Sequence, residues 1–114
     1  MADERKTYVT DEGNRNFKRL VDALRAKRDN LPWTDFTQWI SDRSGIPLSK
    51  DILYRGGRLA KTPAWIVLVA LSRVPEFTFL ESTARPSIDD LTKVLLGEMD
   101  VYGHTIRREA NHSS

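Results

Sequence analysis

The chain has 114 residues, the length of one domain with a single hydrophobic core. Apolar residues make up 39% of the sequence and charged residues 30%, which suits a packed globular core and argues against a membrane protein. The longest uncharged apolar run, residues 64–71, is far shorter than the ~20 residues of a spanning helix. The N-terminal residues lack the apolar stretch of a secretory signal, so we expect a cytoplasmic protein.

Residue types that perform metal or covalent chemistry are scarce. The chain contains no cysteine, which excludes disulfides, thiolate ligands and thiol nucleophiles. Its two histidines, His104 and His112, both fall near the C-terminus. Neither a phosphate-binding glycine loop nor a nucleophile elbow is present. The sequence therefore predicts a binding protein rather than an enzyme, without a metal or a cofactor.

Positive charge is concentrated in the middle of the chain. Residues 15–61 contain eleven Lys and Arg against five Asp, a net charge of +6, whereas residues 1–14 and 62–114 each carry −2. A basic surface attracts polyanions, so this pattern favours nucleic acid as a partner. The simpler alternative is that these side chains only solvate helix faces.

Helical patterns begin near the N-terminus. Apolar residues spaced i, i+3, i+4, i+7 predict a first helix over residues 11–28. Thr34 is a suitable N-cap for a second helix that ends at Gly45. Ser49 then caps a short third helix over residues 50–55. The apolar faces of the first two helices consist of Phe17, Leu20, Val21, Leu24, Phe36, Trp39 and Ile40.

Two more helices are expected in the second half. Thr62 as N-cap and Pro63 at the first helical position predict a fourth helix that ends near Arg73. The Ile-Val-Leu-Val run within it would also suit a buried strand. Ser87 begins a sequence like a capping box and opens a fifth helix that ends near Tyr102.

The junction of the second and third helices has the residues that a helix-turn-helix needs. Ser41 supplies a small residue where the helices cross, Gly45 follows four positions later in the turn, and Ile46 is the aliphatic plug. Residues 15–80 resemble the lambda-repressor-like domains of the Cro and C1 repressor family. The basic first helix, the Arg-Gly-Gly-Arg sequence at 55–58 and the Thr-Pro pair that opens the fourth helix extend the resemblance.

This resemblance implies an all-α, compact five-helix bundle that binds double-stranded DNA sequence-specifically and regulates transcription. The second helix of such a motif lies in the major groove. Lys50 could then donate to guanine, while Arg58 and Lys61 could neutralise phosphates. Ordinary solvation is the alternative for each polar residue, and helix capping for Ser49. The predicted DNA-binding residues are Thr34, Gln38, Ser49, Lys50, Tyr54, Arg55, Arg58, Lys61 and Thr62.

The expected organisation places a helix-turn-helix domain at 13–80 and a C-terminal helix at 86–103, between a flexible N-terminus (1–12) and a disordered tail (104–114). The apolar stripe of the C-terminal helix would either pack over Phe77 and Phe79 or pair with its copy in a homodimer, which we favour.

Among the tryptophans, Trp39 and Trp65 are expected in the core, whereas Trp33 could be exposed. Two other functions remain open at this point. One is a protein-interaction adaptor or regulatory module whose basic face binds an acidic protein, and the other is an RNA-binding protein that uses the same surface.

Overall fold

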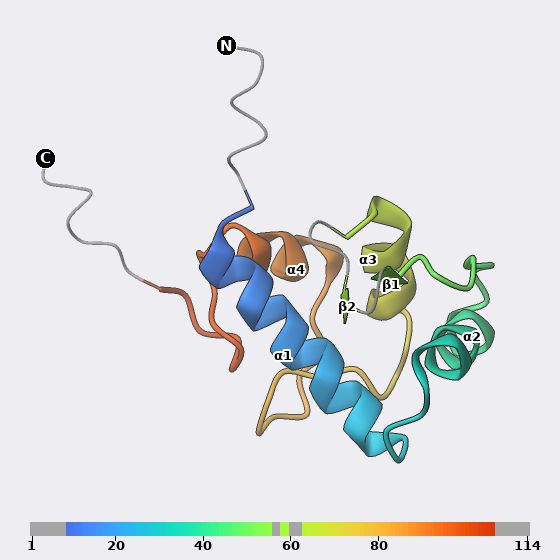
Figure 1. The fold of residues 1–114 in the computed structure, drawn as a ribbon. Helices are drawn as coiled ribbons and strands as arrows, with labels where there is room; N and C mark the ends of the chain where they lie inside the picture. Colours follow the sequence, from blue (N-terminus) through green and yellow to red (C-terminus); the bar gives the residue numbers. More distant parts are fainter. Residues whose placement is uncertain (1–8, 56–57, 60–62, 107–114) are drawn as a thin grey trace, which may run out of the picture.

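The structure, a computed structural model, describes residues 9–55, 58–59 and 63–106. Within these residues the regular secondary structure is helical apart from two strands of two residues each, so the all-α class is confirmed, with four helices in place of the expected five (Figure 1). The elements in chain order are α1 (Asp11–Lys27), α2 (Trp33–Ser44), β1 (Tyr54–Arg55), β2 (Arg58–Leu59), α3 (Trp65–Ser72) and α4 (Ile88–Leu95).

Helix α1 forms where the apolar stripe predicts it. Its N-cap is Thr10, whose hydroxyl oxygen accepts a hydrogen bond from the Gly13 N–H at 2.8 Å. Asp29 and Asn30, both with positive φ, turn the chain toward α2. The predicted stripe of Phe17, Leu20, Val21 and Leu24 is buried.

Helix α2 begins two residues earlier than expected. Pro32, not Thr34, is the N-cap, and its carbonyl accepts a hydrogen bond from the Phe36 N–H at 2.8 Å. The ring of Pro32 fixes φ near the helical range and prepares this earlier start, which leaves Thr34 exposed inside the first turn. Gly45 ends the helix in the left-handed conformation with φ of 75°, as expected.

The predicted third helix over residues 50–55 is wrong. Residues 50–53 form a turn and bend, in which the Ile52 N–H donates to the Ser49 carbonyl, and Tyr54 and Arg55 belong to strand β1. Strand β1 pairs antiparallel with β2, and positions 56 and 57 between them are both glycine in the sequence. Gly-Gly between two short runs is a hairpin signal, and a helix as short as the expected one gains little from its own hydrogen bonds.

Helix α3 confirms the helical interpretation of the apolar run over the strand alternative. It begins at Trp65 with Ala64 as N-cap, two residues after the expected Thr62-Pro63 start, and Thr62 lies outside the described residues. One side of α3 is buried in the core, through Val67, Leu68, Ala70 and Leu71. Trp65 is 63% exposed, so its expected place in the core was wrong. Trp65 is the first residue of α3 and precedes the buried residues, which begin at Val67.

Helix α4 begins with the predicted capping box, in which Ser87 and Asp90 each accept a hydrogen bond from the other's N–H. It ends at Leu95 rather than near Tyr102. A hydrogen-bonded turn follows, closed by a bridge between Met99 and Thr105. The tail predicted from residue 104 overlaps this turn over residues 104–106, and its remainder lies outside the described residues.

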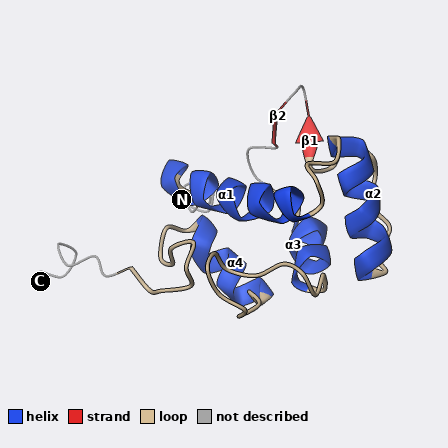
Figure 2. Ribbon diagram, turned by 90° about the horizontal axis from the view of Figure 1, so that it is seen from below, coloured by secondary structure: helices blue, strands red, loops and turns tan. Residues whose placement is uncertain are grey.

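Helices α1 and α4 lie against each other, as both views show (Figures 1 and 2). The contact is closest at Gly13, where a Cβ atom would overlap the carbonyl oxygen of Leu95. The apolar stripe of α4 therefore packs inside the molecule and is buried there, as the first of the two expected arrangements requires. The core that α4 joins includes Phe17, Leu20, Phe36, Leu71, Phe77, Phe79, Leu91, Val94 and Leu95.

Candidate nucleic-acid interface

Two arginines at the C-terminal end of α1 are engaged in holding α2. The Arg25 guanidinium lies 4.5 Å from the centre of the Trp33 ring, and its Nε donates to the Leu31 carbonyl at 2.7 Å. The Arg28 guanidinium lies 5.1 Å from the centre of the Trp39 ring. Both tryptophans are partly buried, as expected for Trp39. These cation–π contacts give the two arginines a structural role.

Three further basic side chains have partners within the protein. Lys27 donates to the Glu76 carbonyl at 3.0 Å and to the Thr78 hydroxyl at 3.2 Å. Arg43 binds both carboxylate oxygens of Glu76, at 3.2 and 2.6 Å. Lys18 pairs with Asp22 on α1 at 3.1 Å. Several basic side chains in the middle of the chain therefore have partners within the protein, and two of them, Lys18 and Arg43, are paired with carboxylates.

The ion pair with Arg43 shifts the titration of Glu76. Partial burial alone would raise the pKa of this carboxyl group, but the hydrogen bonds and positive charge of Arg43, with a backbone hydrogen bond and the charge of Arg28, lower the pKa below its ordinary value. Glu76 is thus held as a carboxylate that fastens the end of α2 to the segment after α3.

Two arginines on α1 have no such partner. Within the described part of the chain, the Arg15 and Arg19 side chains form neither an ion pair nor a hydrogen bond. At 3.6 residues per turn, positions 15 and 19 lie together on the side of α1 opposite its buried stripe. Both residues are exposed. They present two neighbouring positive charges to solvent.

The β1–β2 hairpin lies away from α4. Figure 2 shows α4 on one side of α1 and the hairpin on the other. The register pairs Arg55 with Arg58. Lys50, which is exposed and unpaired among the described residues, lies in the turn just before β1.

The predicted DNA-binding residues are only partly brought together. Thr34 and Gln38 are exposed on α2, where Gln38 donates to Asp42 at 2.9 Å. Ser49 and Lys50 are exposed in the segment before β1, and Ser49 does not cap a helix. Of the others, Tyr54, Arg55 and Arg58 fall within the strands, whereas Lys61 and Thr62 lie outside the described residues.

The sequence-based site omits Arg15 and Arg19, although a signal for them exists. Two like charges at i and i+4 on a helix destabilise it by about 0.2–0.5 kcal/mol. Such a pair on the exposed side of α1 therefore indicates a surface that an external anion could stabilise. Their inclusion moves the candidate interface from α2 toward α1 and the hairpin.

Comparisons of the chain with protein-family models, with curated proteins and with solved structures find no match. Across the described residues, no helix has the length and apolar character to cross a membrane, and no three His, Asp or Glu side chains are grouped as metal ligands. The candidate interface is therefore argued from its own residues.

Proposed function

We propose that the protein binds double-stranded DNA through the outer side of α1 and the β1–β2 hairpin, as a DNA-binding regulator of transcription. The observation that supports this proposal most is that some basic side chains have partners within the protein and others do not. Arg25, Lys27 and Arg43 are engaged within the protein, whereas Arg15 and Arg19 are free among the described residues, on the side of α1 opposite its buried stripe. The hairpin lies on the side of α1 away from α4 (Figure 2).

The spacing of the two free arginines suits a DNA backbone. Four residues of α-helix span about 6 Å along the axis at ~1.5 Å per residue. Successive phosphates of one strand rise ~3.4 Å along the duplex axis and also wind around it, so neighbouring phosphates are themselves about 7 Å apart. Arg15 and Arg19 can therefore each meet a phosphate of the same strand.

The hairpin supplies the element that would enter a groove. A major groove about 12 Å wide admits a two-stranded β-ribbon as well as an α-helix. This proposal replaces base recognition by a helix over residues 49–55, because Tyr54 and Arg55 are in a strand. A hairpin this short would read few base pairs, so a second copy on a paired half-site would extend the recognised sequence. Such a homodimer would use a surface other than the buried stripe of α4.

The proposal is tested by measuring affinity for a random-sequence duplex over a range of salt concentrations. Log K should fall linearly with log salt, with a slope of about −0.9 per phosphate contacted. The double variant Arg15→Ala/Arg19→Ala should make this slope shallower by about 2. The double variant Lys50→Ala/Arg58→Ala should weaken binding by about 1–3 kcal/mol, because Lys50 lies just before the hairpin and Arg58 belongs to its second strand.

A matched control removes two positive charges elsewhere. Arg85 and Lys93 have partners within the protein, the Ser72 carbonyl and Asp89. Arg85→Ala/Lys93→Ala should leave the slope nearly unchanged. If the two double variants changed the salt slope equally, DNA binding would depend on net charge alone, and the proposed binding face would be contradicted. Absence of duplex binding at low salt, together with binding of an acidic protein, would favour the adaptor function instead.

A further inference from the structure

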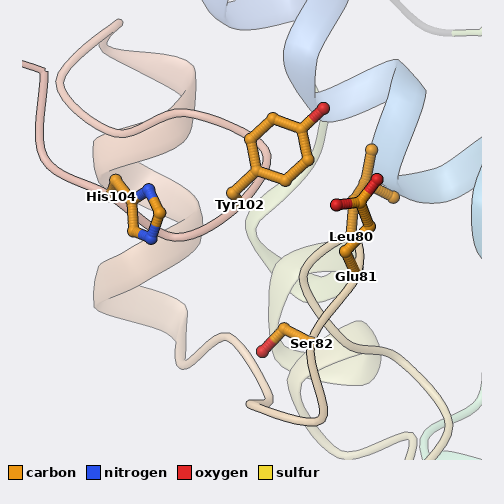
Figure 3. Close-up of a pocket in the computed structure, with 5 residues that line it drawn as sticks. All are labelled: Leu80, Glu81, Ser82, Tyr102 and His104. Carbon is orange, nitrogen blue, oxygen red and sulfur yellow. The ribbon is translucent and has the colours of Figure 1, made fainter.

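A pocket of about 400 Å³ lies at the end of the molecule that contains the turn after α4. It is formed between the loop at residues 80–82 and the turn at residues 100–104. The five lining residues shown in Figure 3 are Leu80, Glu81, Ser82, Tyr102 and His104. None of them belongs to the proposed DNA-binding face.

Backbone hydrogen bonds preform this pocket. The Leu80 N–H donates to the Val101 carbonyl at 2.9 Å, which ties the two walls together. One carboxylate oxygen of Asp100 accepts from the N–H groups of Tyr102 and His104, both at 2.9 Å. Glu81 has a positive φ of 54°, a conformation that is unfavourable for a residue with a side chain. The backbone of the two segments that line the pocket is therefore fixed before any ligand binds.

The polar side chains of the pocket can accept hydrogen bonds, and Glu81 can only accept them. In Figure 3 the Glu81 carboxylate and the His104 ring lie on opposite sides of the Tyr102 ring, with the Ser82 hydroxyl beyond them. The Ser82 oxygen accepts a hydrogen bond from the Ala84 N–H at 2.9 Å and retains a second lone pair. A neutral imidazole offers one acceptor nitrogen, and the face of a tyrosine ring attracts cations.

The charge of Glu81 is not balanced within the described residues. Its carboxylate forms no ion pair there, and neither Lys nor Arg lines the pocket. Lys27 lines an adjoining pocket together with Glu81, but its ammonium group donates to the Glu76 carbonyl and the Thr78 hydroxyl and forms no ion pair with Glu81. The site thus combines one uncompensated carboxylate with an aromatic face and further acceptors.

We propose that this pocket binds a guanidinium group. A guanidinium has five N–H donors, no acceptor and a permanent charge, which complements a set of acceptors around one carboxylate. It can bind Glu81 with two parallel hydrogen bonds while its plane stacks on the Tyr102 ring. The group would come from an arginine side chain in a polypeptide or from a free guanidino compound, and the chemistry of recognition is the same for both.

Titration calorimetry with the full chain tests this proposal. The probes are the peptide Gly-Gly-Arg-Gly-Gly, the same peptide with citrulline in place of arginine, and agmatine. The arginine peptide or agmatine should bind, and the tighter of the two identifies the source of the group. Citrulline keeps the shape but lacks the charge, so its peptide should bind at least about tenfold more weakly, because a charge-assisted hydrogen bond is lost.

Variants assign the binding to this pocket. Glu81→Gln and Tyr102→Ala should each weaken binding of the better probe by about tenfold or more, whereas Tyr102→Phe, which keeps the ring, should bind like the wild type. Asp35→Asn on α2 removes one negative charge far from the pocket and should change nothing. Equal affinity for the citrulline peptide, or wild-type affinity in both folded Glu81→Gln and folded Tyr102→Ala, would overturn the proposal. DNA is absent from every arm, so the result is independent of the proposed DNA-binding face.

Discussion

At the scale of single residues, the same side-chain type performs different tasks according to its neighbours. Arg25 and Arg28 lie over tryptophan rings and Arg43 binds a carboxylate, whereas Arg15 and Arg19 face solvent. The count of basic residues in the sequence could not separate these roles, because the partners of Arg43 and Lys27 are more than thirty positions away along the chain. The local pairs on α1, Arg15 with Arg19 and Lys18 with Asp22, were by contrast visible in the sequence.

The Arg43–Glu76 ion pair predicts a stability that depends on pH. The pKa of Glu76 is lowered in the folded protein, so the pair stabilises the fold above the unfolded-state pKa of about 4.3. This contribution is lost as pH falls through the lower folded-state value. Because both side chains are more than one-third exposed, Glu76→Gln should reduce the free energy of unfolding at pH 7 by at most about 1 kcal/mol.

Urea unfolding of wild type and Glu76→Gln between pH 7 and pH 2 measures this difference. The two proteins should converge at the acidic end, where the wild-type carboxyl is protonated. The stability difference between wild type and Arg43→Gln should depend on pH in the same way as that for Glu76→Gln. The double variant should lose less free energy of unfolding than the sum of the losses in the two single variants. A difference that persists unchanged at pH 2 would contradict the assigned ion pair.

At the scale of elements, long apolar stripes and capping sequences were sufficient to predict α1, the C-cap of α2 and the capping box of α4. Short segments were not predictable in this way, since two-residue strands cannot show an alternating pattern. The expected helix over 50–55 came from treating Ser49 as a cap, although Gly56 and Gly57 also suited a hairpin. This error displaced the candidate site, because four predicted DNA-binding residues depended on that helix.

The contact between α1 and α4 predicts an unusual response at Gly13. Glycine-to-alanine exchange within a helix normally stabilises it by about 1 kcal/mol. Here the new Cβ would overlap the Leu95 carbonyl oxygen, so the two helices must separate. Gly13→Ala should therefore lower the free energy of unfolding by about 1–3 kcal/mol, as overpacking does.

Thermal and urea unfolding of Gly13→Ala measures this loss. Ala26→Gly, the reverse exchange at an exposed position of the same helix, reports helix propensity without the steric contact. It should cost no more than about 1 kcal/mol. A Gly13→Ala variant as stable as the wild type would show that α1 and α4 are not so closely packed.

At the scale of the whole molecule, α4 belongs to the core rather than to a separate segment. The predicted domain boundary near residue 80 was taken from the extent of the resemblance to the repressor family. The sequence of one helix does not reveal which distant helix packs against its apolar face. In the structure, the hydrogen bond from the Leu80 N–H to the Val101 carbonyl joins residues 79–84 to residues 98–106, and Leu91 and Val94 are fully buried. The described part of the chain therefore has one continuous core from α1 to the turn after α4.

Deletion of residues 86–114 tests this single core. The truncation removes five buried apolar side chains, namely Leu91, Val94, Leu95, Met99 and Val101. At about 1.5–3 kcal/mol for each, the lost burial amounts to roughly 7–15 kcal/mol, comparable to the whole stability of a domain at ~5–15 kcal/mol. The truncated chain should therefore lose its cooperative thermal transition in circular dichroism, and its amide protons should exchange rapidly. A truncated chain that unfolds cooperatively and sediments as a compact monomer would instead show that residues 1–85 form a domain by themselves.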